Sequence, residues 1–286
     1  MPAKATATAT RQLTSLYGEM TSLDRVRRAL ERGGVDVEHL QARDLYERDL
    51  DCQNLGGFAM LEVIAATVAE RAAPQPGDHL LDVGCGMGGP GRFLADRYGC
   101  TVTGIDVLPL RVESAEDLTK RTELTERISY RLASATDLPF EDAAFAQAWM
   151  LDVGIHVRDK SALFLEIARV LRPGGLLVMH DQTGPLPKAM APATRNAPFV
   201  APSLPQLIRY VEAAGLRLTT WQDSTARIVA YFQQVKARLG PPDAQPDPEA
   251  HPWREWIRTT TDAYLATLDT LGGRTGIMVA ERQRAS

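Results

Sequence analysis

The sequence predicts an α/β protein built on a seven-stranded, mostly parallel β-sheet with helices on both faces. Three observations carry this prediction. From His79 onward, short apolar runs alternate with amphipathic stretches of helical length. A glycine-rich segment at residues 84–91 follows the first of these runs. Helical stretches separate most consecutive strands, as parallel βαβ units with right-handed crossovers require.

The predicted elements follow one another at short intervals. Residues 11–50 place apolar side chains at helical spacing and predict short amphipathic helices. Gly56-Gly57 precedes a helix at 58–73, which Pro74 and Pro76 end. The core then predicts, in chain order, strand 79–83, helix 89–98, strand 101–106, helix 109–121, strand 127–132, strand 144–150, helix 159–171 and strand 175–180.

The pattern changes after residue 180. A proline-rich stretch at 184–205 predicts a long loop beside a strand end, where lids commonly lie. The remaining predicted elements are helix 203–214, strand 216–222, helices 224–239 and 252–270, and a final strand at 275–282. The insertion of about fifty residues before the last strand is long for a simple connection. A helical cap over the site and a dimer interface are both open interpretations of it.

These elements suggest one large domain with an elaboration. We expect an N-terminal tail and helical cover at 1–55, a ligand-binding core at 56–223 with 274–286, and a helical cap insertion at 224–273.

Composition excludes several function classes. The 286 residues are 44% hydrophobic and 24% charged, and the net charge of −4 gives no electrostatic footprint for nucleic acid. The cysteines are Cys52, Cys85 and Cys100, and their spacing predicts neither a disulfide framework nor a metal site. No apolar run approaches the ~18 residues of a membrane span, and the first residues lack a signal-peptide core. We therefore expect a cytoplasmic protein without a membrane partner.

Residues 80–91 (LLDVGCGMGGPG) carry the strongest functional signal. Glycine lets the backbone adopt positive φ and approach a ligand closely. The helix that follows offers unpaired N–H groups to a negatively charged group. Because Gly84, Gly86 and Gly89 also satisfy G-x-G-x-x-G, the loop alone predicts a nucleotide-type cofactor without identifying it.

Neighbouring residues narrow the choice of cofactor. Asp82 stands two residues before Gly84, where its carboxylate can receive an ammonium group instead of a phosphate. A second strand, TVTGID, ends in Asp106, and a carboxylate at that position can accept both hydroxyls of a ribose. The sequence LRPGG at 171–175 then precedes another apolar strand.

Together these motifs resemble the class I S-adenosylmethionine-dependent methyltransferases, in which D-x-G-x-G-x-G, an acid after strand two and L-x-P-G-G recur in this order. The resemblance covers roughly residues 55–225 and is stronger than that to nicotinamide enzymes. It implies a Rossmann-like core that binds S-adenosylmethionine and releases S-adenosylhomocysteine. By position, the expected cofactor contacts are Asp82, Gly84, Cys85, Gly86, Asp106, Val107, Ser134, Ala135, Met150 and Gln53.

One of these positions departs from the family. Residues 134–140 (SATDLPF) are similar to the family's G-D-A-x-x-L-P-F, whose aspartate contacts the adenine amino group. Ser134 takes the place of that aspartate, and its hydroxyl can accept only a weaker contact. A simple turn residue is the alternative interpretation of Ser134. Ala135 would then supply a backbone contact.

Residues 149–160 (WMLDVGIHVRDK) are the candidate catalytic segment. They lack the [DN]-P-P-[YF] motif of methyltransferases that act on adenine or glutamine nitrogens, which argues against a nucleic-acid base as substrate. They look like small-molecule members of the family, such as sarcosine/dimethylglycine, tocopherol and prenyl-diphosphate methyltransferases. An acceptor must lose a proton, so His156 and Asp152 are the candidate bases. A satisfied core histidine and a loop cap are the alternatives.

Candidate acceptor contacts come from two other segments. His180 ends the fifth strand on the ligand-binding edge. Tyr46 and Gln53 lie in a segment that folds over the cofactor in similar enzymes, although a structural role is equally open. We expect methylation of an N, O or C atom of a small organic acceptor in specialised metabolism. A cyclase that retains the cofactor and a non-catalytic binding module are the alternatives, and a homodimer is left open.

Overall fold

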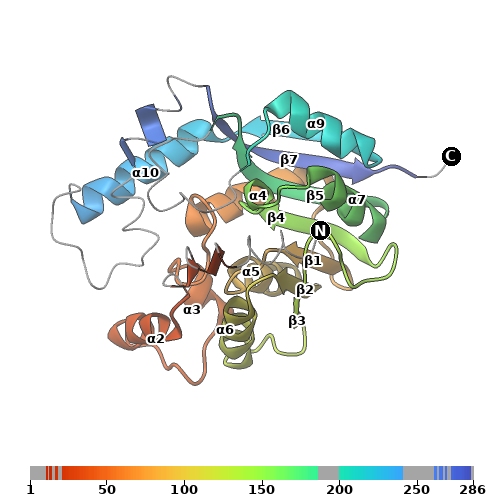
Figure 1. Ribbon diagram of the computed structural model, residues 1–286. Coiled ribbons are helices and arrows are strands. Elements are labelled where there is room, and N and C mark those ends of the chain that lie inside the picture. The colour runs from red at the N-terminus through yellow and green to blue at the C-terminus, as the bar shows by residue number, and fades with distance from the viewer. Residues whose placement is uncertain are drawn as a thin grey trace.

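Seven strands form one sheet in the order β3-β2-β1-β4-β5-β7-β6 (Figure 1). The computed structural model describes residues 11, 13, 14, 17, 18, 21–185, 200–240, 261, 262, 264–266, 268 and 272–284. The strands are β1 (His79–Val83), β2 (Thr101–Asp106), β3 (Ile128–Leu132), β4 (Phe145–Leu151), β5 (Leu171–Thr183), β6 (Leu216–Asp223) and β7 (Arg274–Arg282). β7 runs antiparallel between β5 and β6, and the other neighbours are parallel. The predicted sheet is confirmed.

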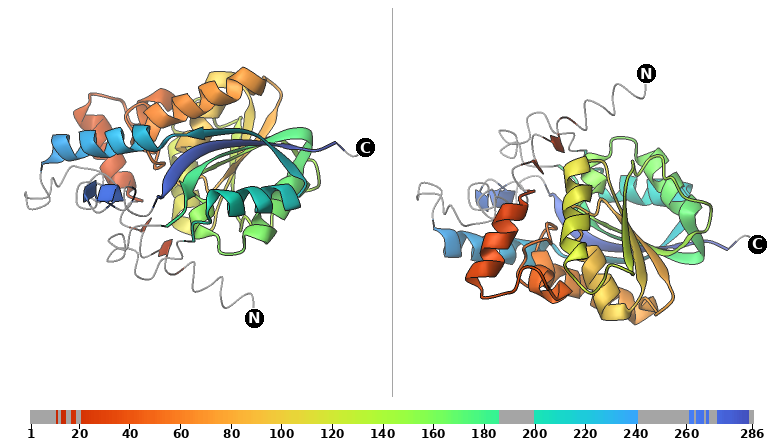
Figure 2. Two further views of the ribbon diagram at one scale, coloured as in Figure 1. Left: turned by 90° about the horizontal axis from the view of Figure 1, so that it is seen from above. Right: turned by 90° about the horizontal axis from the view of Figure 1, so that it is seen from below.

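Helices cover both faces of this sheet. They are α2 (Leu23–Arg32), α3 (Ala42–Tyr46), α4 (Gly57–Ala72), α5 (Gly89–Tyr98), α6 (Pro109–Lys120), α7 (Lys160–Val170), α9 (Leu204–Ala213) and α10 (Thr225–Leu239), with a 3-10 turn, η1 (Gly154–His156). Figure 2 shows α4 and α10 on one side of the sheet and α7 and α9 on the other. The sequence therefore predicted the layers as well as the sheet.

Two hydrophobic cores fill the space between sheet and helices. Leu61 of α4 and Phe232 of α10 belong to one core, and Phe164 of α7 and Leu207 of α9 to the other. Burial of each such side chain contributes roughly 1.5–3 kcal/mol to folding. Because α10 packs into the same core as α4, the start of the predicted cap insertion rests directly on the sheet.

The start of β5 differs from the prediction. The strand begins at Leu171, not at 175, and its pairing with β4 shifts between Phe145–Leu171 and Gln147–Leu176. Proline and glycine weaken a regular strand, so the predicted strand began only after them. The irregular pairing accommodates them, with Gly174 at φ 80°.

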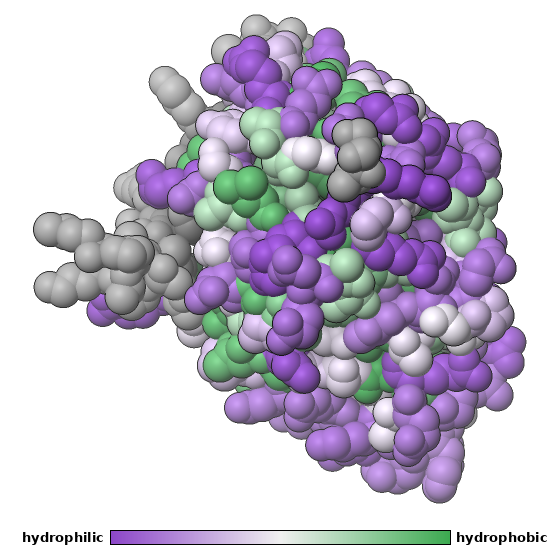
Figure 3. All heavy atoms as spheres, turned by 90° about the vertical axis from the view of Figure 1, so that its right-hand side faces the viewer, coloured by the Kyte–Doolittle hydropathy of each residue, from purple (hydrophilic) through white to green (hydrophobic). Residues whose placement is uncertain are grey.

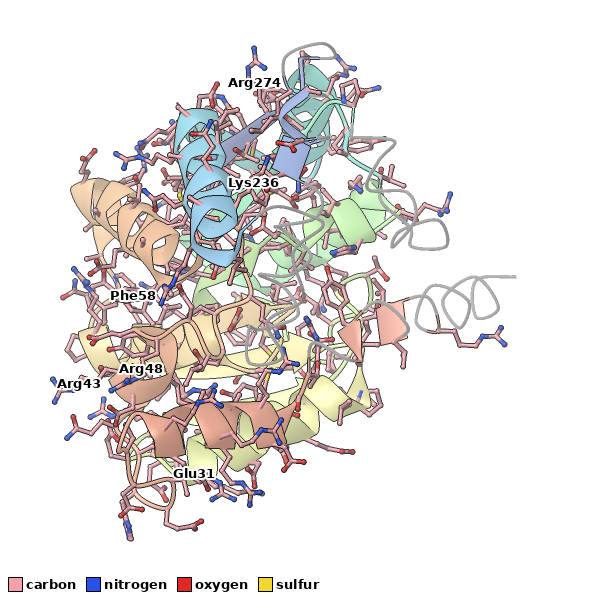
Figure 4. The ribbon with its side chains drawn as sticks, turned by 90° about the vertical axis from the view of Figure 1, so that its left-hand side faces the viewer. Glu31, Arg43, Arg48, Phe58, Lys236 and Arg274 are labelled. Atoms are coloured by element: carbon pink, nitrogen blue, oxygen red, sulfur yellow. The ribbon has the colours of Figure 1, made fainter. Side chains whose placement is uncertain are left out.

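Two predicted elements lie largely outside the described residues. These are the loop at 184–205 and the helix at 252–270; the described positions between 261 and 268 are helical. Among the described residues, no helix is long and apolar enough to cross a membrane. Figure 3 shows the edge at which the parallel strands begin, where hydrophobic residues form small groups among hydrophilic ones. Figure 4 shows the opposite side of the molecule, toward which the parallel strands run.

Candidate active site

The glycine loop between β1 and α5 is held in a backbone conformation that side chains resist. Gly84 has φ 71° and Gly86 has φ 54°. A Cβ atom at Gly84 would lie 2.4 Å from Cγ2 of Val153, which follows β4. The loop is also pinned to β2, because the Cys85 N–H donates to the Ile105 carbonyl at 2.8 Å. Glycine is thus required here by both conformation and packing.

Asp106 at the end of β2 is hydrogen-bonded to this loop. Its Oδ2 accepts the Gly86 N–H at 3.1 Å, and its Oδ1 accepts the Leu108 N–H at 3.0 Å. Nη1 of Arg111 lies 3.8 Å from Oδ2. The carboxylate predicted to bind a ribose therefore lies directly against the glycine loop, and Val107 is half-buried immediately after it.

Arg111 is a site residue that the sequence reasoning missed. Its Nη2 donates to Oε1 of Gln53 at 2.6 Å, and its guanidinium carbon lies 4.2 Å from the centre of the Tyr17 ring. Gln53 in turn donates to the Met87 sulfur at 3.6 Å. One signal was available, because Arg111 stands in the first turn of the helix after the strand-two acid. Gln53 therefore lies beside the glycine loop, and its contact with Arg111 was not predicted from the sequence.

His156 in η1 meets the N-terminal segment. Nε2 of His156 lies 2.8 Å from the hydroxyl oxygen of Tyr17, and the two rings pack edge to face. Burial lowers the pKa of His156 to about 3, and the charges of Arg111 and Lys160 act in the same direction. Burial also raises the pKa of Tyr17. Both groups are therefore neutral at physiological pH, and His156 already has a hydrogen-bonding partner.

Asp152 directly follows β4 in the left-handed backbone region, at φ 57°. Its Oδ2 accepts the Leu55 N–H at 2.7 Å, and its own N–H donates to the His180 carbonyl at 2.7 Å. Oδ1 is buried and has no hydrogen-bond partner among the described residues. Residues held at positive φ are uncommon and cluster at functional sites. The fold thus fixes the orientation of the Asp152 side chain and leaves Oδ1 available to a ligand.

His180 lies behind Asp152 in the interior. The side chain is completely buried, and Nδ1 lies 3.6 Å from Oδ2 of Asp152. Nε2 is within hydrogen-bond distance, 3.0 Å, of the Ser224 hydroxyl just before α10. His180 therefore contacts Asp152, whereas the sequence had predicted that it contacts the acceptor.

Two further buried ionisable side chains, Asp181 and Lys160, form hydrogen bonds with backbone groups near the end of β5. Asp181 accepts the Ile155 N–H at 3.2 Å and the Gln182 N–H at 2.8 Å. Burial, with a smaller contribution from Asp152, raises the pKa of Asp181 to about 7. Lys160 donates to the carbonyls of Val157 and Val200, and burial lowers its pKa to about 8. These contacts hold η1 in place.

Asp82 is buried in β1, one residue before the strand ends. Burial raises its pKa to about 7, the backbone N–H of Gly91 opposes this shift, and the charge of Asp106 adds to it. Oδ2 has no hydrogen-bond partner among the described residues. A buried carboxylate oxygen without a partner is costly unless a ligand supplies one. The observation fits a ligand that brings a positive charge to this end of the loop.

The remaining predicted cofactor contacts line the same edge. Ala135 and Met150 are buried, and the Ala133 N–H donates to the Asp106 carbonyl at 3.0 Å. The Ser134 hydroxyl lies 2.8 Å from the Thr136 hydroxyl, within its own turn. This contact agrees with the turn interpretation of Ser134.

Tyr46 occupies a different place from the one predicted. Its hydroxyl donates to Oδ2 of Asp96 at 2.5 Å, and its ring packs on Phe58 and Phe93. Figure 4 shows Phe58 at the start of α4. Tyr46 therefore joins the N-terminal cover to α4 and α5, and the structure gives it a packing role instead of an acceptor contact.

The fold and this edge define a Rossmann-like protein with a nucleotide-type site at the carboxyl ends of its strands. Comparisons with known proteins agree with that class. Residues 81–179 match a family model described as a methyltransferase domain. The chain is 38% identical over 100 residues to the chloroplastic tocopherol O-methyltransferase of Arabidopsis thaliana, a match covering 35% of this chain and 29% of the relative.

Two solved structures share the fold. A protein of Galdieria sulphuraria, assigned provisionally as a sarcosine dimethylglycine methyltransferase, superimposes with a TM-score of 0.68 at 21% identity, covering 91% of this chain and 98% of that one. The geranyl diphosphate C-methyltransferase of Streptomyces coelicolor gives 0.62 at 19% identity, covering 78% and 77%. Matches to the curated relatives span less than half of their length. The predicted resemblance to methyltransferases is confirmed.

Proposed function

We propose that this protein is an S-adenosylmethionine-dependent methyltransferase that methylates an oxygen atom of a small organic acceptor. The observation that carries the proposal is the hydrogen bond from the Gly86 N–H to Oδ2 of Asp106, at 3.1 Å. It brings the carboxylate at the end of β2 against the glycine loop. The methyltransferase-domain match over 81–179 supports the reaction class. The likeness to a tocopherol O-methyltransferase supports oxygen as the acceptor atom.

The residues present fit this cofactor. The unpartnered oxygen of Asp82 suits the ammonium group, and the backbone around Gly84 and Gly86 suits the methionine end. Asp106 suits the ribose, with Gln53, Cys85 and Val107 nearby, and Ser134, Ala135 and Met150 would border the adenine side. S-adenosylmethionine supplies a methyl group made electrophilic by a positively charged sulfur. The protein's part is to align the acceptor with that group and to exclude water.

Asp152 is the stronger candidate base of the two predicted. Its Oδ1 has no partner among the described residues, whereas Nε2 of His156 faces the Tyr17 hydroxyl. The lowered pKa of His156 makes it a poor proton acceptor near neutral pH. His156 then acts with Tyr17 to close the N-terminal segment over the site.

Other parts of the proposal come from the sequence. These are a role in specialised metabolism, a cytoplasmic location, the absence of a nucleic-acid partner, a homodimer, and the division into cover, core and cap.

Calorimetry with S-adenosylhomocysteine and with reduced nicotinamide coenzyme tests the cofactor. We expect uptake of the former only; uptake of the nicotinamide coenzyme alone would overturn the proposal. Incubation with S-adenosylmethionine and a panel of phenols, followed by mass spectrometry, tests the reaction. We expect a product heavier by one methyl group in place of hydrogen. Conversion of an acceptor without a mass gain would instead support a cyclase or rearrangement enzyme.

A further inference from the structure

Four buried polar atoms lack a hydrogen-bond partner among the described residues and belong to one region of the fold. They are Oδ1 of Asp152, Nδ1 of His180, the hydroxyl oxygen of Tyr264 and Oγ1 of Thr275. All three of His180, Tyr264 and Thr275 are at most 1% exposed. Unsatisfied buried groups are rare in native proteins, because each costs about 1–3 kcal/mol. Several together indicate a place where a ligand or water completes the hydrogen bonds.

Strand register puts two of these residues on the same face of the sheet. His180 of β5 pairs with Ile277 of β7, and Gln182 pairs with Thr275. Cross-strand partners point to the same side, and so do residues two apart along a strand. His180 and Thr275 therefore share the face that carries Ile277, the face covered by α4 and α10.

Tyr264 reaches this face from the segment before β7. Its ring lies 4.6 Å from that of Phe232 on α10, and both belong to the core that contains Ile277. Lys236 of α10 (Figure 4) donates to both carboxylate oxygens of Asp262, at 2.6 and 2.7 Å, and ties the two helical segments together. The charge of Asp152 contributes to raising the pKa of Tyr264, after burial, so the two groups are within electrostatic reach.

Unpartnered polar atoms therefore lie next to a hydrophobic core. Asp152 can only accept a hydrogen bond when ionised, whereas the hydroxyls of Tyr264 and Thr275 can both donate and accept. A hydroxyl on the ligand matches this set, because it can donate to Asp152 and accept from Tyr264 or Thr275. Phe232 and Ile277, which belong to the same hydrophobic core as Tyr264, favour an aromatic or aliphatic body for the molecule that carries the hydroxyl.

We propose that Asp152, Tyr264 and Thr275 form the subsite that binds the acceptor's hydroxyl, with His180 positioning Asp152, and that the acceptor is a phenol. This inference rests on the proposed methyltransferase function. The phenol O–H donates to Oδ1 of Asp152, and the Tyr264 hydroxyl donates to the phenol oxygen. In the reaction the proton passes to Oδ1, and an electron pair of the phenol oxygen forms the bond to the methyl carbon. The carbon–sulfur bond breaks with its electron pair remaining on sulfur.

His180 is a positioning residue in this arrangement. The Ser224 hydroxyl holds Nε2 at 3.0 Å, and Nδ1 faces Asp152 from behind at 3.6 Å. Ser224 is itself fixed to β7, because its N–H donates to the Thr275 carbonyl at 2.9 Å. Because the Leu55 N–H donates to Oδ2 at 2.7 Å and His180 lies against the same oxygen, Oδ1 is left for the acceptor.

The test uses 4-nitrophenol, whose ionised form absorbs visible light, and the full-length protein saturated with S-adenosylhomocysteine. In the wild type we expect binding to raise the pKa of the phenol, and so to reduce its visible absorbance, because the phenolate would face the Asp152 carboxylate. Asp152→Asn should abolish or reverse this spectral change. Tyr264→Phe should weaken phenol binding about fivefold, as the loss of about 1 kcal/mol predicts, and Tyr210→Phe on the exposed side of α9 is the matched control.

The outcomes separate the two proposals. Failure of the wild type to bind S-adenosylhomocysteine would overturn both the proposed methyltransferase function and the phenol subsite. Normal cofactor binding with no uptake of 4-nitrophenol, or with the same spectral change in wild type and Asp152→Asn, would overturn the phenol subsite alone. The second result would mean that the four atoms serve only buried water. Thr275→Val, which keeps the side-chain shape, gives a second measurement should Tyr264→Phe fail to fold, and is also expected to weaken phenol binding.

Discussion

The hydroxyl oxygen of Tyr17 lies 2.8 Å from Nε2 of His156, which joins positions 139 residues apart in the sequence. The same tyrosine ring lies under the guanidinium of Arg111, whose other partners are Gln53 and Asp106. The N-terminal segment is therefore connected to the residues expected to bind the cofactor.

Replacing Tyr17 with phenylalanine should loosen the N-terminal segment without removing its ring. The hydrogen bond to His156 is lost, while the contact with Arg111 is kept. A buried hydrogen bond contributes about 1 kcal/mol, so the dissociation constant for S-adenosylhomocysteine should rise about fivefold by calorimetry. Tyr210→Phe should leave it unchanged. An unaltered constant in Tyr17→Phe would show that closure of this segment does not assist cofactor binding.

Asp106→Asn should weaken cofactor binding more strongly. The carboxylate accepts N–H groups from Gly86 and Leu108, and its charge strengthens bonds to ribose hydroxyls. Hydrogen bonds to charged groups contribute about 1.5–3 kcal/mol, so the dissociation constant for S-adenosylhomocysteine should rise about 10- to 100-fold. Asp117→Asn removes a carboxylate from a partly exposed ion pair on the next helix and is the control. Similar constants for the two variants would contradict the ribose assignment.

The residues that local sequence could predict are those whose role depends on local backbone geometry. Gly84 and Gly86 must adopt positive φ, and Asp106 ends a strand, so pattern and position alone identified them. The mostly parallel character of the sheet followed for a similar reason, because alternation of strands and helices leaves few topologies.

Tyr17, Arg111 and Tyr264 could not be predicted in the same way. Each acts through partners far away in the sequence: Tyr17 through His156, Arg111 through Gln53, and Tyr264 through Phe232. Helical spacing predicts which face of a segment is buried, but not the residue it will meet. Tyr46 was assigned to an acceptor contact for that reason, and its partner is Asp96.

Asp82 should make stability depend on pH. Its pKa is raised in the folded protein to about 7 from an ordinary value near 3.8. The stabilisation is therefore fully present below pH ~4, and it is lost as the pH rises through 7. Relative to Asp82→Asn, the wild type should lose up to about 4 kcal/mol of unfolding free energy over this range, measured by urea denaturation.

Cofactor binding should show the opposite dependence. The ammonium group of S-adenosylhomocysteine pairs with the ionised form of Asp82, so its affinity should rise between pH ~6 and pH ~8. Asp82→Asn should flatten this profile. Asp181 also has a raised pKa, and it remains in both proteins, so the difference between them isolates Asp82. Parallel pH profiles for wild type and variant, in stability and in affinity, would contradict the assigned burial and role of Asp82.

Two glycines with almost the same backbone conformation give the sharpest test of the loop. Gly34 has φ 69°, and among the described residues no atom lies within 4 Å of the position its Cβ would take, whereas a Cβ at Gly84, with φ 71°, would meet Val153 at 2.4 Å. Gly34→Ala should therefore cost only the left-handed strain of about 1–2 kcal/mol. Gly84→Ala should cost a further ~1–3 kcal/mol because of the clash. Adding Val153→Ala to Gly84→Ala should recover part of that further loss. Urea unfolding of the wild type, the two glycine variants and this double variant would show it. Equal losses for the two glycine variants, or no recovery with Val153→Ala, would mean that contact with Val153 does not restrict this loop.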